Sequence, residues 1–207
     1  MPTVPTVREA KRQATVDVLI LAAQRGLTSH GLDLTIDDVA DIAGVNRSTI
    51  FRHFASRDDL FAAAVIKGGS EFDRSLPEYD GGDWRVWLRQ LCDVSHRRAE
   101  ETSRGLWELT RRRDLSPALT DALSRLQEGR RLRYLSIAST LWRAADRDDP
   151  VPATICDVVA AHLSPLFTIT VLTDIAGSDS QLAATLAESC IAAVLNQGRG
   201  DHKHPST

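Results

Sequence analysis

The sequence predicts an all-α protein of about nine helices, and three observations support this prediction. Apolar residues recur at helical spacing, as in Ile36, Val39, Ala40 and Ala43, which stand at i, i+3, i+4 and i+7. Capping residues such as Thr35 precede the apolar stretches, and glycine or proline separates them. From residue 84 onward, the signals typical of strands are scarce. Hydrophobic residues make up 43% of the 207 residues, which is enough to bury a core.

The stretch 35–57 is expected to contain two short helices joined by a tight turn. The hydroxyl of Thr35 can accept a hydrogen bond from an early amide of the first helix, and Asp38 lies near the positive end of that helix dipole. Gly44 can adopt a positive φ, which ends the first helix and turns the chain sharply. Asn46 can then cap the second helix.

The second helix is expected over residues 47–53, with Ile50 and Phe54 pointing inward. Its outward face carries Ser48 and Arg52, flanked by Thr49 and Phe51. Residues 46–57 contain arginines and a histidine but no carboxylate. Such a face has the donors needed for base edges and phosphates in a major groove, although an ordinary solvated helix has the same composition.

This part of the chain resembles the DNA-binding domain of the TetR family of bacterial transcriptional regulators over about residues 10–66. The matching residues are Gly31, TIDDVADIAGV at 35–45, NRSTIFRHF at 46–54, Ser56, Arg57 and Leu60. Glycine, caps, apolar positions and aromatic positions agree in order. The resemblance implies a three-helix helix-turn-helix DNA-binding domain, followed by a C-terminal helical bundle for ligand binding and dimerisation.

The resemblance also implies which side chains approach DNA. The residues expected to approach bases are Arg47, Ser48, Thr49 and Arg52. The residues expected near the phosphate backbone are Thr35, Phe51, His53 and Arg57. The family usually has a tyrosine where this chain has Phe51, so a phenolic hydrogen bond to phosphate is missing. Phe51 is expected to pack on sugars or a thymine methyl instead.

The net charge of −3 does not by itself favour binding to nucleic acid. Within residues 1–60, however, six of the seven Lys and Arg side chains gather at the two ends. They are Arg8, Lys11 and Arg12 at one end and Arg47, Arg52 and Arg57 at the other. A fold that brings the two groups together would form a positive stripe without a basic domain.

The cysteines, Cys92, Cys156 and Cys190, are few and far apart, and they fit neither a disulfide framework nor a metal-binding spacing. They are expected to be free thiols in a reducing cytoplasm, and a redox-sensing role for one of them stays open. No stretch is long and apolar enough for a membrane span, and the N-terminus lacks a signal-peptide core. A cytoplasmic protein is therefore expected.

Further helices are expected over residues 8–29, 56–76, 84–102, about 106–113, and 117–145. Gly31 is expected to end the first of these in the left-handed conformation, and residues 1–7 to form a mobile arm. The expected domains are a DNA-binding domain at 1–55, an effector-binding and dimerisation domain at 56–200, and a disordered tail at 201–207.

Two strongly apolar segments, about 153–175 and 179–196, close the chain, and Pro165 should kink the first. Both are apolar on more than one face, so a single core stripe would not cover them. They are expected to pair with the same segments of a second copy in a four-helix interface. The alternative is that they form the core of a monomer.

A small-molecule pocket is expected in the C-terminal part, because tryptophans and a few polar groups gather there. Its candidate lining residues are Trp87, Leu91, Trp107, Trp142, His162 and Phe167. The alternative is that each tryptophan only fills the core. The family resemblance implies an effector in this region without identifying it.

No motif for acyl transfer, phosphate binding or metal-assisted hydrolysis is found, so no enzyme activity, catalytic residue, cofactor or metal site is expected. The expected function is a homodimeric transcriptional regulator, most simply a repressor that an effector releases from a palindromic double-stranded DNA operator. The alternative is a small-molecule-binding helical protein whose operator recognition is weak or lost.

Overall fold

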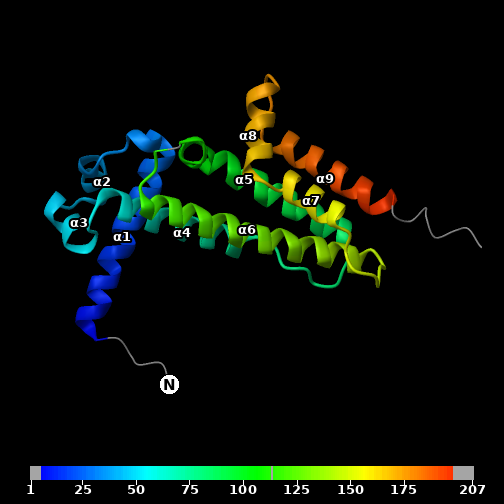
Figure 1. The fold of residues 1–207 in the computed structure, drawn as a ribbon, viewed down its shortest axis with the longest axis horizontal. Coiled ribbons are helices and arrows are strands. Elements are labelled where there is room, and N and C mark those ends of the chain that lie inside the picture. The colour runs from blue at the N-terminus through cyan, green and yellow to red at the C-terminus, as the bar shows by residue number, and fades with distance from the viewer. Residues whose placement is uncertain (1–5, 113, 198–207) are drawn as a thin grey trace, which may run out of the picture. The chain divides into compact units, whose positions relative to one another are not determined.

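The computed structural model describes residues 6–112 and 114–197, and the side chains of residues 103–111 lie outside that description. The expected tail and most of the expected N-terminal arm also lie outside it. Within the described residues there are nine α-helices, one short 3-10 helix and no strand (Figure 1). The all-α prediction is confirmed.

The chain forms two compact units, each assembled from separate stretches of sequence. The first contains α1 (Val7–His30), η1 (Gly31–Asp33), α2 (Ile36–Ala43), α3 (Arg47–His53), α4 (Arg57–Ser75) up to residue 71, and residues 104–127. The second contains residues 72–103, which include most of α5 (Trp84–Arg111), and the part of α6 (Pro117–Ala144) from residue 128. It is completed by α7 (Ala153–His162), α8 (Pro165–Asp174) and α9 (Ser180–Gln197). This division differs from the expected limits at 1–55 and 56–200, because α4, α5 and α6 each contribute to both units.

The helix-turn-helix of the first unit begins with a capping box. The Asp38 amide donates to Thr35 Oγ1 at 3.1 Å, and the Asp38 carboxylate accepts from the Thr35 amide at 2.8 Å. Gly44 then ends α2 in the left-handed conformation, at φ 66° and ψ 37°. The cap by Thr35 and the turn at Gly44 were predicted, whereas the hydrogen bond from the Thr35 amide to the Asp38 carboxylate was not. Asn46 occupies the N-cap position of α3 as expected, but its side chain makes no capping hydrogen bond.

The core of the first unit is continuous from α1 to the start of α6. Its fully buried side chains include Leu19, Leu34, Ile50, Leu60 and Phe61. Gly26 allows α1 to approach Leu34, because a Cβ at Gly26 would lie 2.5 Å from the Leu34 Cδ1 atom. This close approach gives the glycine in the middle of α1 a packing role that the sequence pattern did not reveal.

Several helix boundaries differ from the sequence prediction. Residues 84–102 and the short helix after them form one continuous helix, α5. The segment 153–175 is not one kinked helix but two, α7 and α8, bent by 54°, and Pro165 is the first residue of α8. Gly31 has a positive φ of 58°, but its ψ of −140° is not left-handed helical, and it opens η1.

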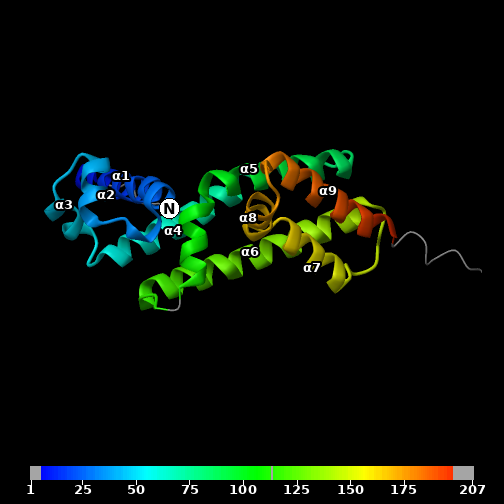
Figure 2. The ribbon, with the colours of Figure 1, turned by 90° about the horizontal axis from the view of Figure 1, so that it is seen from above.

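In the second unit, α9 packs against both α7 and α8. Figure 2 shows α8 almost along its axis, so α8 runs across the direction of α9. The core contains Leu88, Leu91, Cys92, Leu141 and Ile191, all with 1% exposure or less. Among the described residues, no single helix is long and apolar enough to cross a membrane, and only the bent pair α7 and α8 together has that length and composition.

Candidate nucleic-acid interface

The helix α3 buries one face and exposes the other, as the sequence predicted. Ile50 is fully buried in the core of the first unit, and Phe54 packs against that core. The side chains of Arg47, Ser48, Phe51 and Arg52 are exposed, and Thr49 is half-buried. A seven-residue helix is marginal by itself, so burial of Ile50 is what orients the exposed face.

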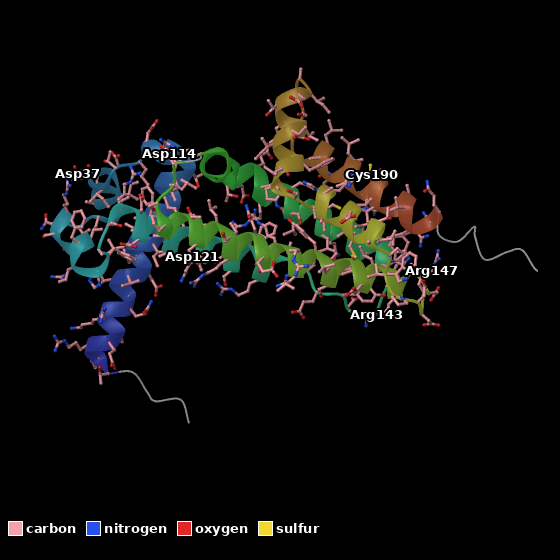
Figure 3. The ribbon with its side chains drawn as sticks, viewed as in Figure 1. Asp37, Asp114, Asp121, Arg143, Arg147 and Cys190 are labelled. Atoms are coloured by element: carbon pink, nitrogen blue, oxygen red, sulfur yellow. The ribbon has the colours of Figure 1, made fainter. Side chains whose placement is uncertain are left out.

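Arg47 is held by contacts from two sides. Its Nη1 atom donates to Asp37 Oδ2 at 3.1 Å and to Oδ1 at 3.3 Å. Its guanidinium carbon also lies 5.5 Å from the centroid of the Phe51 ring, one turn further along α3. Figure 3 labels Asp37 on α2. The sequence analysis did not single out Asp37, although its place in the first turn of α2 was a usable signal.

Thr35 and His53 flank the exposed face of α3. The Thr35 hydroxyl donates to Asp38 Oδ2 at 2.6 Å, and the hydrogen bonds from the Thr35 hydroxyl and amide hold the pKa of the Asp38 carboxyl below its usual range. His53 is half-buried, and its Nδ1 atom is buried without a hydrogen-bond partner among the described residues. Because the Thr35 hydroxyl already donates to Asp38, it is less available to a phosphate than the sequence suggested.

Arg57, the first residue of α4, is tethered rather than free. Its Nη1 atom lies 3.5 Å from the Leu34 carbonyl oxygen, its Nε atom donates to Asp58 at 3.3 Å, and its guanidinium carbon lies 5.1 Å from the Phe61 ring centroid. The same side chain borders a hollow of about 190 Å³ within the first unit. The other lining residues are Leu32, Asp58, Arg112, Asp114, Leu115, Ser116 and Leu119. The sequence did not predict that residues 112, 114–116 and 119 line a hollow together with Arg57, because they lie far from Arg57 along the chain.

Arg8, Lys11 and Arg12 are exposed in the first turns of α1. The described contacts do not join them to α3, so a shared positive stripe stays a prediction.

The residues expected to line a pocket, apart from Trp107, lie in the second unit, and they fall into two groups. The first group is part of the packed core. Trp87 and Trp142 are buried, and their indole N–H groups donate to the carbonyl oxygens of Pro77 at 2.9 Å and Asp149 at 3.0 Å. Leu91 belongs to the same core. All three side chains are packed, and the indole donors of both tryptophans are satisfied. The side chain of Trp107 lies outside the described residues.

His162 and Phe167 instead lie beside a buried polar pair. The Phe167 ring centroid is 5.0 Å from that of His162 and 5.7 Å from that of His96. His96 is fully buried, and its Nδ1 atom is 2.8 Å from the hydroxyl oxygen of Thr168, which is also fully buried. Neither His96 nor Thr168 was among the lining residues that the sequence predicted.

The contacts of His96 favour one tautomer. If the Thr168 hydroxyl donates to Nδ1, the only unpaired group is the N–H at Nε2, which has no partner among the described residues. The opposite arrangement would leave both the hydroxyl proton and a ring nitrogen unpaired, which costs more in a buried site. Burial, and to a smaller extent His162, lowers the pKa of His96 to about 4, so the ring is neutral at pH 7.

In the described part of the chain, neither the environment of the buried cysteines nor the placement of the acidic groups favours thiol chemistry or metal binding. Burial raises the pKa of the Cys92 and Cys156 thiols, which disfavours the reactive thiolate, and Cys190 is exposed on α9. No group of three or more His, Cys, Asp or Glu side chains with metal-binding geometry occurs among the described residues.

The capped α2, the left-handed turn at Gly44 and the exposed cationic face of α3 define a helix-turn-helix protein. Residues 19–64 match the family model described as "Bacterial regulatory proteins, tetR family". Residues 19–64 of this chain therefore match the TetR family of bacterial regulatory proteins, as the resemblance over residues 10–66 predicted.

The fold of the whole chain is similar to solved structures of transcriptional regulators. A TetR-family regulator from Streptomyces coelicolor matches with a TM-score of 0.66 at 20% identity, covering 93% of this chain and 86% of that chain. The regulator FadR from Bacillus subtilis, in complex with stearoyl-CoA, matches with 0.64 at 12% identity, covering 84% and 96%. A protein from Saccharomonospora viridis in complex with choline matches with 0.64 at 19% identity, covering 87% and 96%. The chain has a TetR-family regulator fold.

The buried neutral His96 predicts a specific loss of stability in acid. The unfolded chain binds a proton near pH 6.5 and the folded chain only near pH 4, so stability falls as the pH drops from about 6.5 to about 4. The loss should reach up to about 3 kcal/mol in the free energy of unfolding. Denaturant unfolding at stepped pH would show this loss in the wild type and a smaller one in His96→Asn, whose amide can still contact Thr168. The exposed His30→Asn variant serves as the control, and an acid loss that is unchanged in His96→Asn would contradict the assignment.

Proposed function

We propose that the protein is a cytoplasmic, homodimeric transcriptional repressor that binds a palindromic DNA operator and is released by a small-molecule effector. The observation that carries this proposal is the exposed face of α3, which presents Arg47, Ser48 and Arg52 and carries no carboxylate. A two-fold dimer would place two copies of α3 in successive major grooves, about 34–36 Å apart.

The proposed division of contacts follows the family resemblance. Ser48 and Arg52 lie on the face of α3 opposite Ile50, so they would approach base edges. Thr49, beside that face, and Arg47, exposed at the start of α3, would also approach bases. Thr35, Phe51, His53 and Arg57 would lie near phosphates and sugars.

The DNA-binding proposal predicts different behaviour for two arginine variants. Selection of bound duplexes from a random pool should first yield a palindrome. Arg52→Ala should then weaken operator binding by about 1–3 kcal/mol and relax base preference at one position of each half-site. Arg57→Ala should weaken binding evenly across sequences and lower the salt dependence by about one phosphate contact. Equal effects of the two variants would show that the division between base and phosphate contacts is wrong.

Dimerisation through α8 and α9 is supported by a face on each helix that consists of apolar and hydroxyl-bearing side chains. On α9 its exposed residues are Thr185, Leu186, Ser189, Cys190 and Ala193, with Leu182 half-buried beside them. On α8 they are Leu166, Thr170 and Thr173, with Ile169 half-buried, and the charged Asp174 is exposed at the C-terminal end of that helix. Figure 3 places Cys190 on the outer side of α9. The hydroxyls of Thr185 and Ser189 already donate to carbonyls of their own helix, at 2.9 and 2.8 Å, so burying them leaves no donor unpaired.

A charge placed on this face should separate the dimer. Leu186→Glu would bury a carboxylate in the proposed interface, which is costly without a partner, while glutamate keeps the helix propensity of leucine. Sedimentation equilibrium at micromolar concentration should show a dimer for the wild type and a monomer for Leu186→Glu. The matched control is Leu132→Glu, on an exposed position of α6, which should stay dimeric. A monomeric wild type would refute the interface.

The effector site is proposed in the second unit around His96, His162 and Phe167, with Trp87, Leu91 and Trp142 as surrounding apolar side chains. Trp107 stays a sequence prediction, because its side chain lies outside the described residues. The unpaired N–H at His96 Nε2 requires an acceptor, and the neutral ring offers no charge to compensate a charged ligand atom. We therefore propose an uncharged, largely apolar effector with one oxygen acceptor. Among the matched folds, one holds stearoyl-CoA and another holds choline, so the fold accommodates small molecules of different chemistry.

Two probe molecules of similar shape test this ligand class. Acetophenone carries a carbonyl oxygen that ethylbenzene lacks, so only acetophenone can accept a hydrogen bond from Nε2. The wild type should show a larger thermal stabilisation with acetophenone than with ethylbenzene, and His96→Leu should lose the difference. Equal shifts in the wild type would show that Nε2 has another partner, such as a buried water.

Release of DNA requires coupling between the two units. α4, α5 and α6 each contribute residues to both units, so they are the covalent routes for that coupling. A 100-fold loss of DNA affinity on effector binding requires a coupling free energy of roughly 2.7 kcal/mol.

The alternative function is a small-molecule-binding protein with weak or lost operator recognition. One observation favours it, namely Phe51 in the position where the family usually has tyrosine. The duplex selection separates the two functions, because a protein that has lost its operator would enrich no sequence.

A further inference from the structure

The contacts of Arg47 restrict one of the proposed base-reading side chains before DNA is present. Asp37 reaches it from α2, and Phe51 lies beneath it on α3. All three side chains are exposed to solvent, and each contact alone is weak at such a site. Because both contacts act on one guanidinium, they confine it to one orientation.

The orientation leaves a particular edge of the guanidinium available. Both hydrogen bonds to Asp37 run from Nη1, at 3.1 and 3.3 Å. Among the described contacts, neither Nε nor Nη2 of Arg47 has a hydrogen-bond partner. A guanidinium has two bidentate edges, and the Nε–Nη2 edge is the one that Asp37 does not occupy. Two parallel N–H donors of this kind match the O6 and N7 acceptors of guanine.

The charge of Asp37 distinguishes between the two kinds of DNA partner. A phosphate bound to Arg47 would approach the Asp37 carboxylate within a few ångströms, and two like charges at that distance repel each other. A guanine edge carries no net charge, so it avoids most of this repulsion. Asp37 therefore disfavours the use of Arg47 as a phosphate clamp.

We propose that Asp37 is a specificity-determining positioning residue, which together with Phe51 presents the Nε–Nη2 edge of Arg47 to a guanine and opposes sequence-independent binding through the same arginine. This inference rests on the proposed DNA-binding function. It assigns a role in recognition to an acidic residue that lies outside the recognition helix.

The test compares Asp37→Asn with Asp41→Asn. Asp41 is exposed one turn further along α2, makes no ion pair with an arginine among the described residues, and loses the same charge on substitution. Dissociation constants are measured for the selected operator and for a scrambled duplex of equal length, at several salt concentrations. Asp41→Asn should tighten both by a similar factor. Asp37→Asn should tighten only the scrambled duplex, so that the ratio of the two constants falls at least about fivefold.

Two further variants show whether Asp37 acts through Arg47. In an Arg47→Ala background, Asp37→Asn should cause no additional loss of the ratio, and Asp37→Glu should restore most of it in the otherwise wild-type protein. A second round of duplex selection with Asp37→Asn should lose a guanine preference at one position of each half-site. Equal ratios for Asp37→Asn and Asp41→Asn, or a loss that persists in the Arg47→Ala background, would overturn the inference.

A measurement without DNA separates this inference from the proposed function. NMR relaxation of the Arg47 Nε–H group should report a more ordered side chain in the wild type than in Asp37→Asn or Phe51→Leu. If the wild type binds no duplex selectively, the proposed function fails and the role in recognition fails with it, whereas the restraint on Arg47 is still decided by the relaxation data. If binding is selective but Arg47 is equally mobile in all three proteins, only this inference fails.

Discussion

Burial of Ile50 is the constraint on which the arrangement of the helix-turn-helix depends. The helix α3 has only seven residues, too few to be stable by itself in water. Seating Ile50 in the core beside Leu34, Leu60 and Phe61 holds α3 in place and directs its cationic face outward. The left-handed turn at Gly44 and the capping box of α2 fix the path of the chain into α3, so local and tertiary preferences agree at this point.

The exposed face of α3 is not simply a basic surface. Asp37 on α2 engages Arg47 on this face, and at the start of α4 Asp58 engages the nearby Arg57. In a chain with a net charge of −3, such pairing limits the long-range attraction for any polyanion. Recognition in such a protein depends more on the orientation of individual donors than on the total positive charge.

The second unit combines an apolar core with one polar pair that is fully buried. His96 and Thr168 come from α5 and α8, and a hydrogen bond joins them in a region where unpaired polar groups are costly. The face that is proposed to contact a second copy lies on α8 and α9. The helix α8 thus contributes both to the polar pair and to that proposed contact.

The sequence by itself determined the all-α class, the capped α2, the turn at Gly44 and the buried and exposed faces of α3, because these features depend on local propensity and helical periodicity. Only the tertiary structure decided that α5 is continuous, that Pro165 begins a separate helix, that residues 104–127 join the first unit, and that Asp37, Thr168 and Gly26 have specific partners. Periodicity identifies which face of a helix is apolar but not which other element covers it. Contacts between side chains that are distant in sequence, such as those 72 residues apart at His96 and Thr168, depend on how the helices pack, and no local pattern encodes them.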